Sequence, residues 1–230
     1  GPDTLIEGGV QVGSRKITAP KVLIATGSQT LVPAIRGIED VPTLDSKSLL
    51  ELETLPESLI FIGAGYIGAE LAQMMSRMGV KVTMVARSRL LPGAEPEVSD
   101  ALSEAFRTEG ITLLTGLQYD SVLASKDGVT LKVIQGGAVK EVTAERIVLT
   151  AGRRANTEDL GLEELEVQTD SRGGIVVGQD MQTSRPGIYA AGDVTDRDQF
   201  VYMAAYGAKI AARNAVAEGD GHYDNSTMPW

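Results

Sequence analysis

Short apolar runs that end in glycine recur along the chain, and several are followed by apolar residues at helical spacing. The clearest region begins with the apolar run 59–62 and continues through Gly63, Gly65 and Gly68. Apolar residues then recur as they would on one face of a helix, at Ile67, Leu71, Met74, Met75 and Met78. Gly79 is placed to end this helix, and a second apolar run covers 81–86. The pattern predicts a strand, a helix and a second strand in succession.

The remaining patterns predict further strands around this unit. Short alternating pieces within 1–20 predict small antiparallel strands, and 118–144 predict an antiparallel meander with turns at 126–128 and 136–137. Apolar runs predict buried strands over 21–27, 145–152 and 187–193, and further strands over 111–114 and 175–177. The polar run 153–157 reads as a crossing between domains, and the tail 218–230 is expected to be loop.

Three further helices are expected. The first covers 47–53 and is capped by Asp45 or Ser46. The last covers 200–217 and is rich in alanine. The middle one covers 96–109, and its predicted apolar face consists of Val98, Leu102, Ala105 and Phe106.

Composition excludes several kinds of function. The chain has 230 residues, of which 43% are hydrophobic, and a net charge of −10, which argues against nucleic acid or an anionic membrane as a partner. It contains no cysteine, so it holds no disulfide, thiol nucleophile or thiolate metal site. His222 is its single histidine, which argues against a Ser-His-Asp centre or a histidine metal cluster. No apolar run approaches membrane-spanning length and no leader pattern is present, so we expect a cytoplasmic protein.

The glycine turn after residue 62 carries the first candidate chemistry. Gly63 permits a tight turn, Gly65 lets the backbone approach a pyrophosphate, and Gly68 lets the helix pack closely on the strand. The pyrophosphate would lie on the free N–H groups at the start of the helix. The alternative is a glycine turn without a ligand.

The end of the second strand indicates which dinucleotide binds. An NAD site usually has Asp or Glu there, bonded to the ribose hydroxyls. This chain has Ala86, followed by Arg87 and Arg89, and arginine binds phosphate through charge-assisted bonds. We therefore predict NADP(H) in preference to NAD(H). The alternative is that both arginines are solvated surface charges.

Three apolar strands end in closely similar glycine turns, at 25–27, 150–152 and 191–193. Ligands of open α/β sheets bind at the carboxyl ends of the strands. Together with the glycine turn at 63–68, these turns indicate two nucleotide cofactors.

These motifs resemble those of the flavin-dependent pyridine nucleotide–disulfide oxidoreductases, a family that includes dihydrolipoamide dehydrogenases, glutathione reductases and mercuric reductases. The matching stretches are 22–28, 63–70, 151–157 and 183–193. Their order and spacing cover nearly the whole chain. Residues 196–214 most resemble the mercuric reductase branch.

The resemblance implies an α/β, Rossmann-like, three-layer FAD/NAD(P)-binding fold with an antiparallel β-meander. An NAD(P)-binding domain over 38–156 would be inserted into a partial FAD-binding domain formed by 1–37 and 157–217. The resemblance also implies a fragment, because the family's segment with the redox cysteines and its dimerisation domain have no counterpart here. A naturally truncated protein is the alternative. The complete protein is expected to be a homodimer.

The resemblance also assigns roles on the nicotinamide side. Tyr66 would cover the nicotinamide pocket beside Ile67, and Glu70 would lie near the carboxamide. Gly152 and Arg153 would line the mouth of the pocket. The alternatives are a tyrosine that packs the helix and a glutamate favoured by the helix dipole.

On the flavin side, Thr26 and Gly27 would lie beside FAD, and Asp193 would bond the ribityl chain while Gly192 lets the backbone come close. Asp193 could instead cap the next helix.

The function that the resemblance implies is passage of hydride from NADPH to FAD and on to a dithiol or disulfide, with Hg(II) as the substrate reduced. A dihydrolipoamide dehydrogenase-like disulfide reductase is the first alternative. The second is an NADP(H)-binding module without activity. No residue of this chain is expected to be catalytic, because the redox cysteines are absent and no metal site is expected.

Overall fold

The chain folds into two units. The computed structural model describes residues 3–126, 128–217 and 219–228. Unit 1 consists of Gly1–Gln29 and Arg154–Trp230, and unit 2 is the continuous stretch Thr30–Arg153. The division expected from the sequence had its boundaries at residues 38 and 156, and its assignment of the two parts to NAD(P) and FAD stays a prediction. Asp127 in the predicted first turn of the meander, and residues 218, 229 and 230 of the predicted tail, lie outside the described residues.

A five-stranded parallel sheet forms the middle layer of unit 2. Its strand order is β6-β13-β7-β8-β9, and each strand runs parallel to its neighbour. Connections between parallel strands of one sheet must cross over a face of the sheet, so helices and loops cover it. The strands span Thr43–Leu44 (β6), Arg146–Leu149 (β13), Ser58–Ile62 (β7), Lys81–Val85 (β8) and Thr112–Leu114 (β9).

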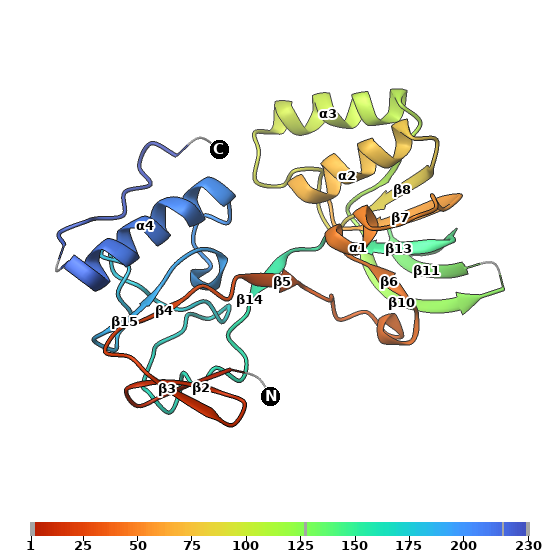
Figure 1. Ribbon diagram of the computed structural model, residues 1–230. Helices are drawn as coiled ribbons and strands as arrows, with labels where there is room; N and C mark the ends of the chain where they lie inside the picture. Colours follow the sequence, from red (N-terminus) through yellow and green to blue (C-terminus); the bar gives the residue numbers. More distant parts are fainter. Residues whose placement is uncertain (1–2, 127, 218, 229–230) are drawn as a thin grey trace. The chain divides into compact units, whose positions relative to one another are not determined.

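Two further layers enclose the sheet. Helices α2 (Tyr66–Arg77) and α3 (Pro96–Thr108) lie on one face, and the antiparallel meander β10-β11-β12 lies on the other (Figure 1). The three strands of the meander span Gln118–Ser125, Gly128–Gln135 and Ala138–Ala144. The predicted three-layer α/β fold with a meander is confirmed.

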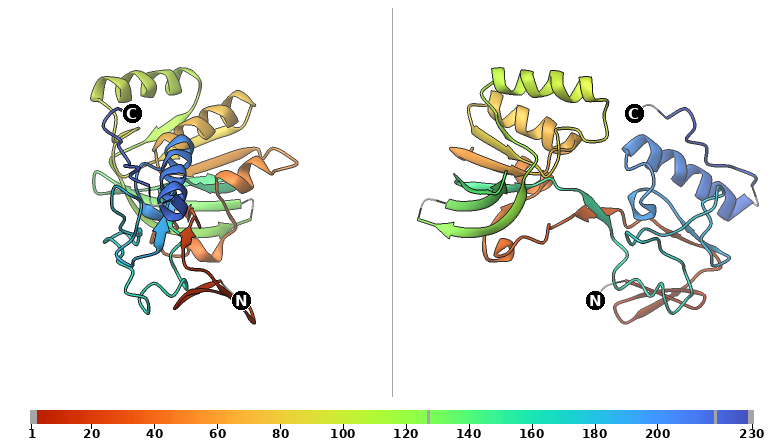
Figure 2. Two further views of the ribbon diagram at one scale, coloured as in Figure 1. Left: turned by 60° about the vertical axis from the view of Figure 1, so that its left-hand side comes forward. Right: turned by 180° about the vertical axis from the view of Figure 1, so that it is seen from behind.

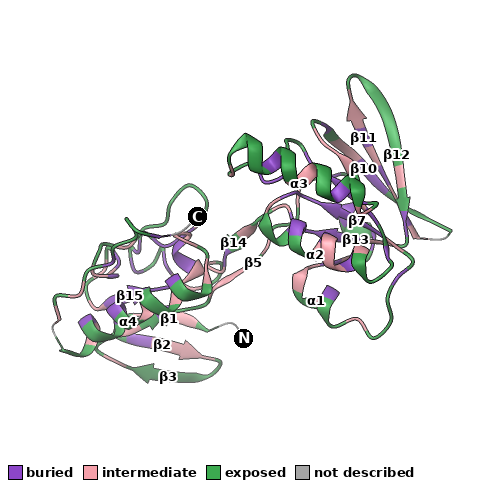
Figure 3. Cartoon of the chain, turned by 90° about the horizontal axis from the view of Figure 1, so that it is seen from above, coloured by how far each residue is buried: buried purple, intermediate pink, exposed green. Residues whose placement is uncertain are grey.

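Strand β7 explains why both faces of the sheet are covered. Leu59 and Phe61 pack into the core beneath the helices, whereas Ile60 and Ile62 pack into the core toward the meander. All four side chains are fully buried, and β7 and β13 are coloured as buried in Figure 3. Side chains alternate between the faces of a strand, so a continuous apolar run requires a partner on each face.

The predicted apolar faces of α2 and α3 were partly wrong. The residues of α2 that face the sheet are Gly68, Ala69, Ala72 and Met75, whereas Ile67 and Met78 are exposed. In α3, Val98 and Ala105 point outward, and Ser99 is buried because its hydroxyl donates to the Leu90 carbonyl oxygen. Close packing of a helix on a sheet favours small residues at the contact, which a search for large apolar side chains overlooks.

Unit 1 is built around the parallel pair β4 (Val22–Ile24) and β15 (Ile188–Ala190). Helix α4 (Val201–Ala217) and the antiparallel sheet β1-β2-β3 lie on opposite sides of this pair (Figures 1 and 2). Side chains of β15 alternate between two cores, with Ile188 and Ala190 in one and Tyr189 in the other, beside α4. The strands of the small sheet are Thr4–Ile6, Gly9–Val12 and Arg15–Thr18.

The crossing expected at 153–157 and the strand expected at 175–177 differ in part from the structure. Residues Arg153–Ala155 form strand β14, which pairs with β5 (Ser28–Thr30). The expected strand at 175–177 makes only isolated bridges, Thr169 to Ile175 and Val177 to Thr183. Leu23, predicted to be buried, is 38% exposed.

The short elements of unit 2 include helix α1 (Ser46–Leu50), for which Asp45 is the cap, as expected. A 3-10 helix, η1, covers Ile38–Asp40. No helix in the described part of the chain is long and apolar enough to cross a membrane.

Candidate functional site

The first candidate site is the glycine turn between β7 and α2. Gly63 has a φ of 109°, a conformation that L side chains rarely adopt, and its N–H donates to the Val85 carbonyl oxygen at 2.9 Å. A Cβ at Gly63 would meet the backbone of Thr150 and Ala151, at the end of β13. The position therefore requires glycine both for its backbone angle and for its close contact with the neighbouring strand.

Thr150 links this turn to the helix. Its side-chain oxygen lies 3.2 Å from the carbonyl oxygens of both Ile62 and Gly63. A Cβ at Gly68 would lie 2.7 Å from the same oxygen and 2.9 Å from the Gly63 carbonyl oxygen. Thr150 is buried. Its hydroxyl contacts the end of β7, and its position limits how closely α2 can approach the sheet. Its position at a strand end was predicted from the sequence, but its contacts within the site were not.

Gly65 has a different environment. It is the N-cap of α2, its backbone is extended, and no side chain caps the helix there. A Cβ at Gly65 would meet nothing within 4 Å. The first N–H groups of a helix have no partner within the helix, and together with the helix dipole they favour an anion. Open space at such an N-terminus fits a pyrophosphate.

The residues expected on the nicotinamide side gather around this turn. Tyr66, Ile67 and Glu70 lie on the exposed side of the first turns of α2. Gly152 has a φ of 134°, and its carbonyl oxygen accepts a hydrogen bond from the Leu31 N–H at 3.0 Å. Arg153 follows as the first residue of β14.

The residues expected to choose the dinucleotide follow β8. Ala86 is buried, and its N–H donates to the Leu114 carbonyl oxygen at 2.9 Å. Arg87 is exposed. The guanidinium of Arg89 instead donates to the carbonyl oxygens of Pro92 and Ala94, within its own loop. The two arginines are therefore not equivalent.

Tyr119 lies beside this strand end. Its hydroxyl donates to the Val85 carbonyl oxygen at 3.2 Å. Burial raises the pKa of Tyr119, and the positive charge of Arg87 opposes that shift. The phenol therefore stays neutral and acts as a donor that fixes the end of β8.

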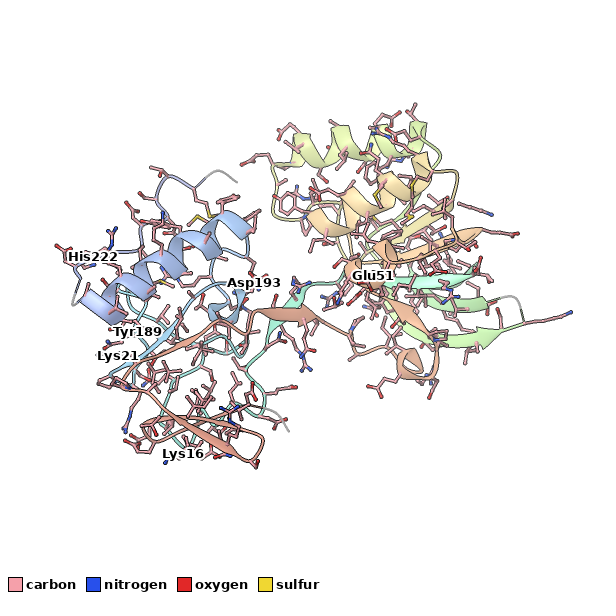
Figure 4. The ribbon with its side chains drawn as sticks, viewed as in Figure 1. Lys16, Lys21, Glu51, Tyr189, Asp193 and His222 are labelled. Carbon is pink, nitrogen blue, oxygen red and sulfur yellow. The ribbon has the colours of Figure 1, made fainter. Side chains whose placement is uncertain are left out.

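The second candidate site lies in unit 1, at the ends of β4 and β15. Because the two strands are parallel, the turn at Gly27 and Ser28 and the turn at Gly192 and Asp193 lie together. The Ser28 hydroxyl donates to a carboxylate oxygen of Asp193 at 2.6 Å, which bridges the turns. Asp193 is labelled in Figure 4, near the beginning of α4.

The glycines of this site allow close approach of the backbone. Gly27 has a φ of 72°, and a Cβ there would meet nothing within 4 Å. Gly192 has a φ of 77°, and a Cβ there would lie 3.3 Å from the Cβ of Ala204 on α4. Asp193 opens the 3-10 helix η2 (Asp193–Thr195), of which Gly192 is the N-cap.

Asn156 fixes the turn at Gly27. Its side-chain amide donates to the Thr26 carbonyl oxygen at 2.9 Å, and its own carbonyl oxygen accepts from the Thr26 hydroxyl at 2.8 Å. Its N–H donates to the Gly27 carbonyl oxygen at 2.9 Å. Asn156 and Ser28 lie in the stretches that match the family, but the sequence pattern indicated no role for either residue.

Asp196 is a buried carboxylate beside the same turn. Its side chain is 8% exposed, and the Nε of Arg172 lies 2.6 Å from its Oδ2. That oxygen has no hydrogen-bond partner of good geometry, so the contact is an ion pair rather than a directed hydrogen bond. Burial raises the pKa of Asp196, and the charge of Arg172 opposes that shift. No sequence pattern indicated this residue.

The predicted site residues thus fall into two groups. One group surrounds the glycine turn of unit 2, and the other surrounds the paired strand ends of unit 1. A glycine turn that opens a helix after a parallel strand, together with glycines at further strand ends, is typical of dinucleotide-binding α/β proteins.

Comparison with known proteins gives the family. The chain belongs to the pyridine nucleotide-disulphide oxidoreductase family, whose model matches residues 3–219. It is 41% identical over 208 residues to a mercuric reductase of Staphylococcus aureus, covering 90% of this chain and 38% of that protein. It is 42% identical over 211 residues to a mercuric reductase of Bacillus cereus, covering 91% of this chain and 33% of that protein. The chain therefore spans well under half the length of these relatives.

Similar solved structures support this family assignment. The Cu(II) complex of the HOCl-induced flavoprotein disulfide reductase RclA of Escherichia coli matches with a TM-score of 0.87 and 29% identity, covering 98% of this chain and 52% of that one. An engineered water-forming NADPH oxidase bound to NADPH matches with a TM-score of 0.78 and 26% identity, covering 88% of this chain and 47% of that one. The predicted Rossmann-like FAD/NAD(P)-binding fold and the predicted family are confirmed.

Proposed function

We propose that this chain is the NADPH-binding part, with a portion of the FAD-binding part, of an oxidoreductase that reduces Hg(II) through a dithiol. The glycine turn with open space at Gly65, followed along the chain by Ala86 and Arg87, carries the nicotinamide half of the proposal. The names of the curated relatives support the substrate. The chain contains no cysteine, so by itself it is expected to be inactive.

Within this proposal the protein binds and orients the cofactors. When bound, FAD accepts hydride from NADPH and supplies the electrons that reach the dithiol of the complete protein. The N-terminus of α2 holds the pyrophosphate of NADPH, and Gly65 allows its close approach. Tyr66 would cover the nicotinamide pocket, Glu70 would lie near the carboxamide, and Gly152 and Arg153 would line the mouth.

The choice of NADPH rests on Arg87 rather than on Arg89. Arg87 is exposed and follows the strand end directly, whereas Arg89 donates to two carbonyl oxygens of its own loop. Arg87 would bind the 2′-phosphate, and Arg89 would hold the loop that presents it. Ala86 leaves no carboxylate to repel the phosphate.

The engineered NADPH oxidase supports this choice. In that engineered protein, aspartate, alanine and methionine at three successive positions are replaced by alanine, arginine and serine. The same three residue types in the same order, Ala86, Arg87 and Ser88, follow β8 in this chain. That protein is bound to NADPH.

The flavin half of the proposal rests on unit 1. The Ser28 hydroxyl aligns the Asp193 carboxylate, which would accept a hydrogen bond from the ribityl chain. Thr26, Gly27 and Gly192 would border the cofactor, because the open space at Gly27 admits a ligand close to the backbone.

Titration calorimetry with NADPH and NADH tests the nicotinamide half. We expect the chain to bind NADPH at least about tenfold more tightly, because one charge-assisted contact to the phosphate contributes about 1.5–3 kcal/mol. Arg87→Ala should weaken NADPH binding by about ten- to a hundredfold and leave NADH binding unchanged. Arg107→Ala, which removes an exposed arginine of α3 paired with Glu104, is the matched control. Equal affinities of the unaltered chain for NADPH and NADH would contradict the proposal.

Further assays distinguish the proposed function from its two alternatives. The complete protein should reduce Hg(II) with NADPH, whereas turnover of lipoamide but not Hg(II) would favour a dihydrolipoamide dehydrogenase-like enzyme. Absorbance at about 450 nm in the purified chain would reveal retained flavin. NADPH binding without flavin would favour an isolated NADP(H)-binding module. A homodimeric complete protein and a cytoplasmic location stay predictions.

A further inference from the structure

We propose that residues 220–228, which we call the clasp, hold the loop between the Gly192–Asp193 turn and α4 in place, and that Tyr223 is the positioning residue of this device. The inference deepens the flavin half of the proposed function and rests on it. The match to the family model ends at residue 219, just before the clasp.

Tyr223 is anchored at both ends. Its side chain is buried, and its N–H donates to the Gln179 carbonyl oxygen at 2.7 Å. Its hydroxyl donates to Oδ2 of Asp198 at 2.9 Å, and the side-chain amide of Asn225 donates to the same oxygen at 2.8 Å. Two donors from the clasp therefore converge on one carboxylate of the loop.

The ring of Tyr223 lies in a closely fitted position. The guanidinium of Arg197 lies 4.7 Å from the centre of the ring, and the ring of Tyr206 lies 5.2 Å away. A Cβ at Gly207 of α4 would lie 3.3 Å from the Tyr223 ring. The ring thus packs against both the loop and the helix that follows it.

Asn214 ties the beginning of the clasp to α4. Its side-chain amide donates to the Gly221 carbonyl oxygen at 2.8 Å, and its side-chain oxygen accepts from the Gly221 N–H at 3.0 Å. The same amide donates to the Asp180 carbonyl oxygen at 3.0 Å. These bonds keep the clasp against the helix, independently of Tyr223.

The loop needs such support. Asp196 has a φ of 52° and Asp198 a φ of 40°, both in the left-handed region that L residues other than glycine seldom adopt. Such backbone conformations persist only where the surroundings enforce them. The bonds from Tyr223 and Asn225 to the Asp198 carboxylate supply that constraint.

The constrained loop adjoins the proposed flavin site. The Asp196 N–H donates to the Asp193 carbonyl oxygen at 3.0 Å. On the other side of the loop, Ala204 in the first turn of α4 packs against Gly192. If the bond from Tyr223 to Asp198 were lost, the loop would be less constrained, and the turn at Gly192 and Asp193 would lose support from both sides. Tyr223 itself need not contact the cofactor for this effect.

Hydrogen–deuterium exchange of the cofactor-free chain tests the inference. In Tyr223→Phe, which keeps the ring, we expect the amides of 193–200 to exchange about tenfold faster, the change that one hydrogen bond to a charged acceptor produces. The matched control is Tyr202→Phe, because Tyr202 is 46% exposed and its ring stacks on that of Phe200, with the ring centres 5.4 Å apart. Unchanged exchange of 193–200 in Tyr223→Phe would overturn the inference.

Two further measurements separate the clasp from the flavin. Asp198→Asn with Tyr223→Phe should exchange no faster than the faster of the two single variants, because both alter the same bond; fully additive acceleration would count against the clasp. In the complete protein, Tyr223→Phe should lower FAD affinity several-fold. If exchange accelerates and FAD affinity does not change, the clasp holds the loop but Tyr223 has no positioning role for the flavin, which overturns that part of the inference. If the unaltered complete protein binds no FAD, the proposed function fails. The exchange result still decides whether the clasp holds the loop in place.

Discussion

The contact between Gly68 and Thr150 allows a sharp test of how the glycine turn is built. In Gly68→Ala, the added Cβ would lie 2.7 Å from the Thr150 side-chain oxygen and 2.9 Å from the Gly63 carbonyl oxygen. One obstacle is a side chain and the other is backbone, so a change of rotamer cannot relieve both. We expect α2 to be displaced from the sheet at its first turn.

The energetic effect is the difference between two opposing terms. Overpacking a close contact costs about 1–3 kcal/mol, while replacing glycine by alanine within a helix gains up to about 1 kcal/mol. Gly68→Ala should therefore lower the free energy of unfolding by about 1 kcal/mol. Thr150→Ala removes the nearer obstacle but also a buried hydroxyl. Gly68→Ala should therefore cost less in a Thr150→Ala background than in the unaltered chain, but still something, because the Gly63 carbonyl oxygen remains.

Gly65→Ser is the matched variant at the neighbouring glycine. A side chain there enters open space and can cap α2, so the free energy of unfolding should be unchanged or higher by roughly a few tenths of a kcal/mol. The same hydroxyl would occupy the amides proposed for the pyrophosphate, and NADPH affinity should fall by about tenfold or more.

Thermal denaturation followed by circular dichroism and calorimetric titration with NADPH measure both effects. The expected pattern is reduced stability for Gly68→Ala, and reduced NADPH affinity at full stability for Gly65→Ser. If Gly68→Ala unfolds at the same temperature as the unaltered chain, the helix does not depend on the close approach at that position. If Gly65→Ser binds NADPH as tightly as the unaltered chain, the pyrophosphate does not lie at this N-terminus.

Two other substitutions test buried polar groups. Thr150→Val keeps the shape of the side chain but removes the hydroxyl that lies against the Ile62 and Gly63 carbonyl oxygens, so the free energy of unfolding should fall by about 1–3 kcal/mol. Thr150→Ser keeps the hydroxyl and should lower the free energy of unfolding by less. Equal losses in the two variants would show that the methyl group matters rather than the hydroxyl. Burial raises the pKa of Asp196 above its usual 3.8, so the folded chain binds its proton at a higher pH than the unfolded chain does. Stability from this group should increase as the pH falls from neutral toward about 4, and Asp196→Asn should remove that increase in urea denaturation measured across this range. An undiminished increase in Asp196→Asn would assign it to other groups.

The elements of the fold could be predicted because local patterns specify them. Strand β7 is a continuous apolar run that is buried on both faces, and Gly63 and Gly79 mark the turns on either side of α2. The face of α2 was predicted less well, because the contact with the sheet uses Gly68 and Ala72 rather than large apolar residues. Hydrophobic periodicity gives most weight to large side chains, whereas close packing selects small ones.

The partners within each site could not be predicted from spacing. Ser28 bonds Asp193 across 165 positions, and Thr150 lies against Gly63 across 87 positions. Such pairs depend on which strand ends the topology brings together, which a local pattern does not encode. The role of Tyr223 could not be predicted for a similar reason. Its stretch has the composition of a loop and forms one, and its hydrogen bond to Asp198 depends on the tertiary structure.

The way the chain enters and leaves unit 2 has a consequence for folding kinetics. Unit 1 is assembled from two segments separated by the whole of Thr30–Arg153. Pairing β4 with β15 in an unfolded chain therefore closes a loop of about 165 residues, at an entropic cost of about 4–5 kcal/mol. Within unit 2, the Leu31 N–H donates to the Gly152 carbonyl oxygen at 3.0 Å, which brings its two ends together. Once unit 2 has folded, most of that loop is already closed. Unit 2 should therefore fold first and act as the nucleus on which the two halves of unit 1 find each other.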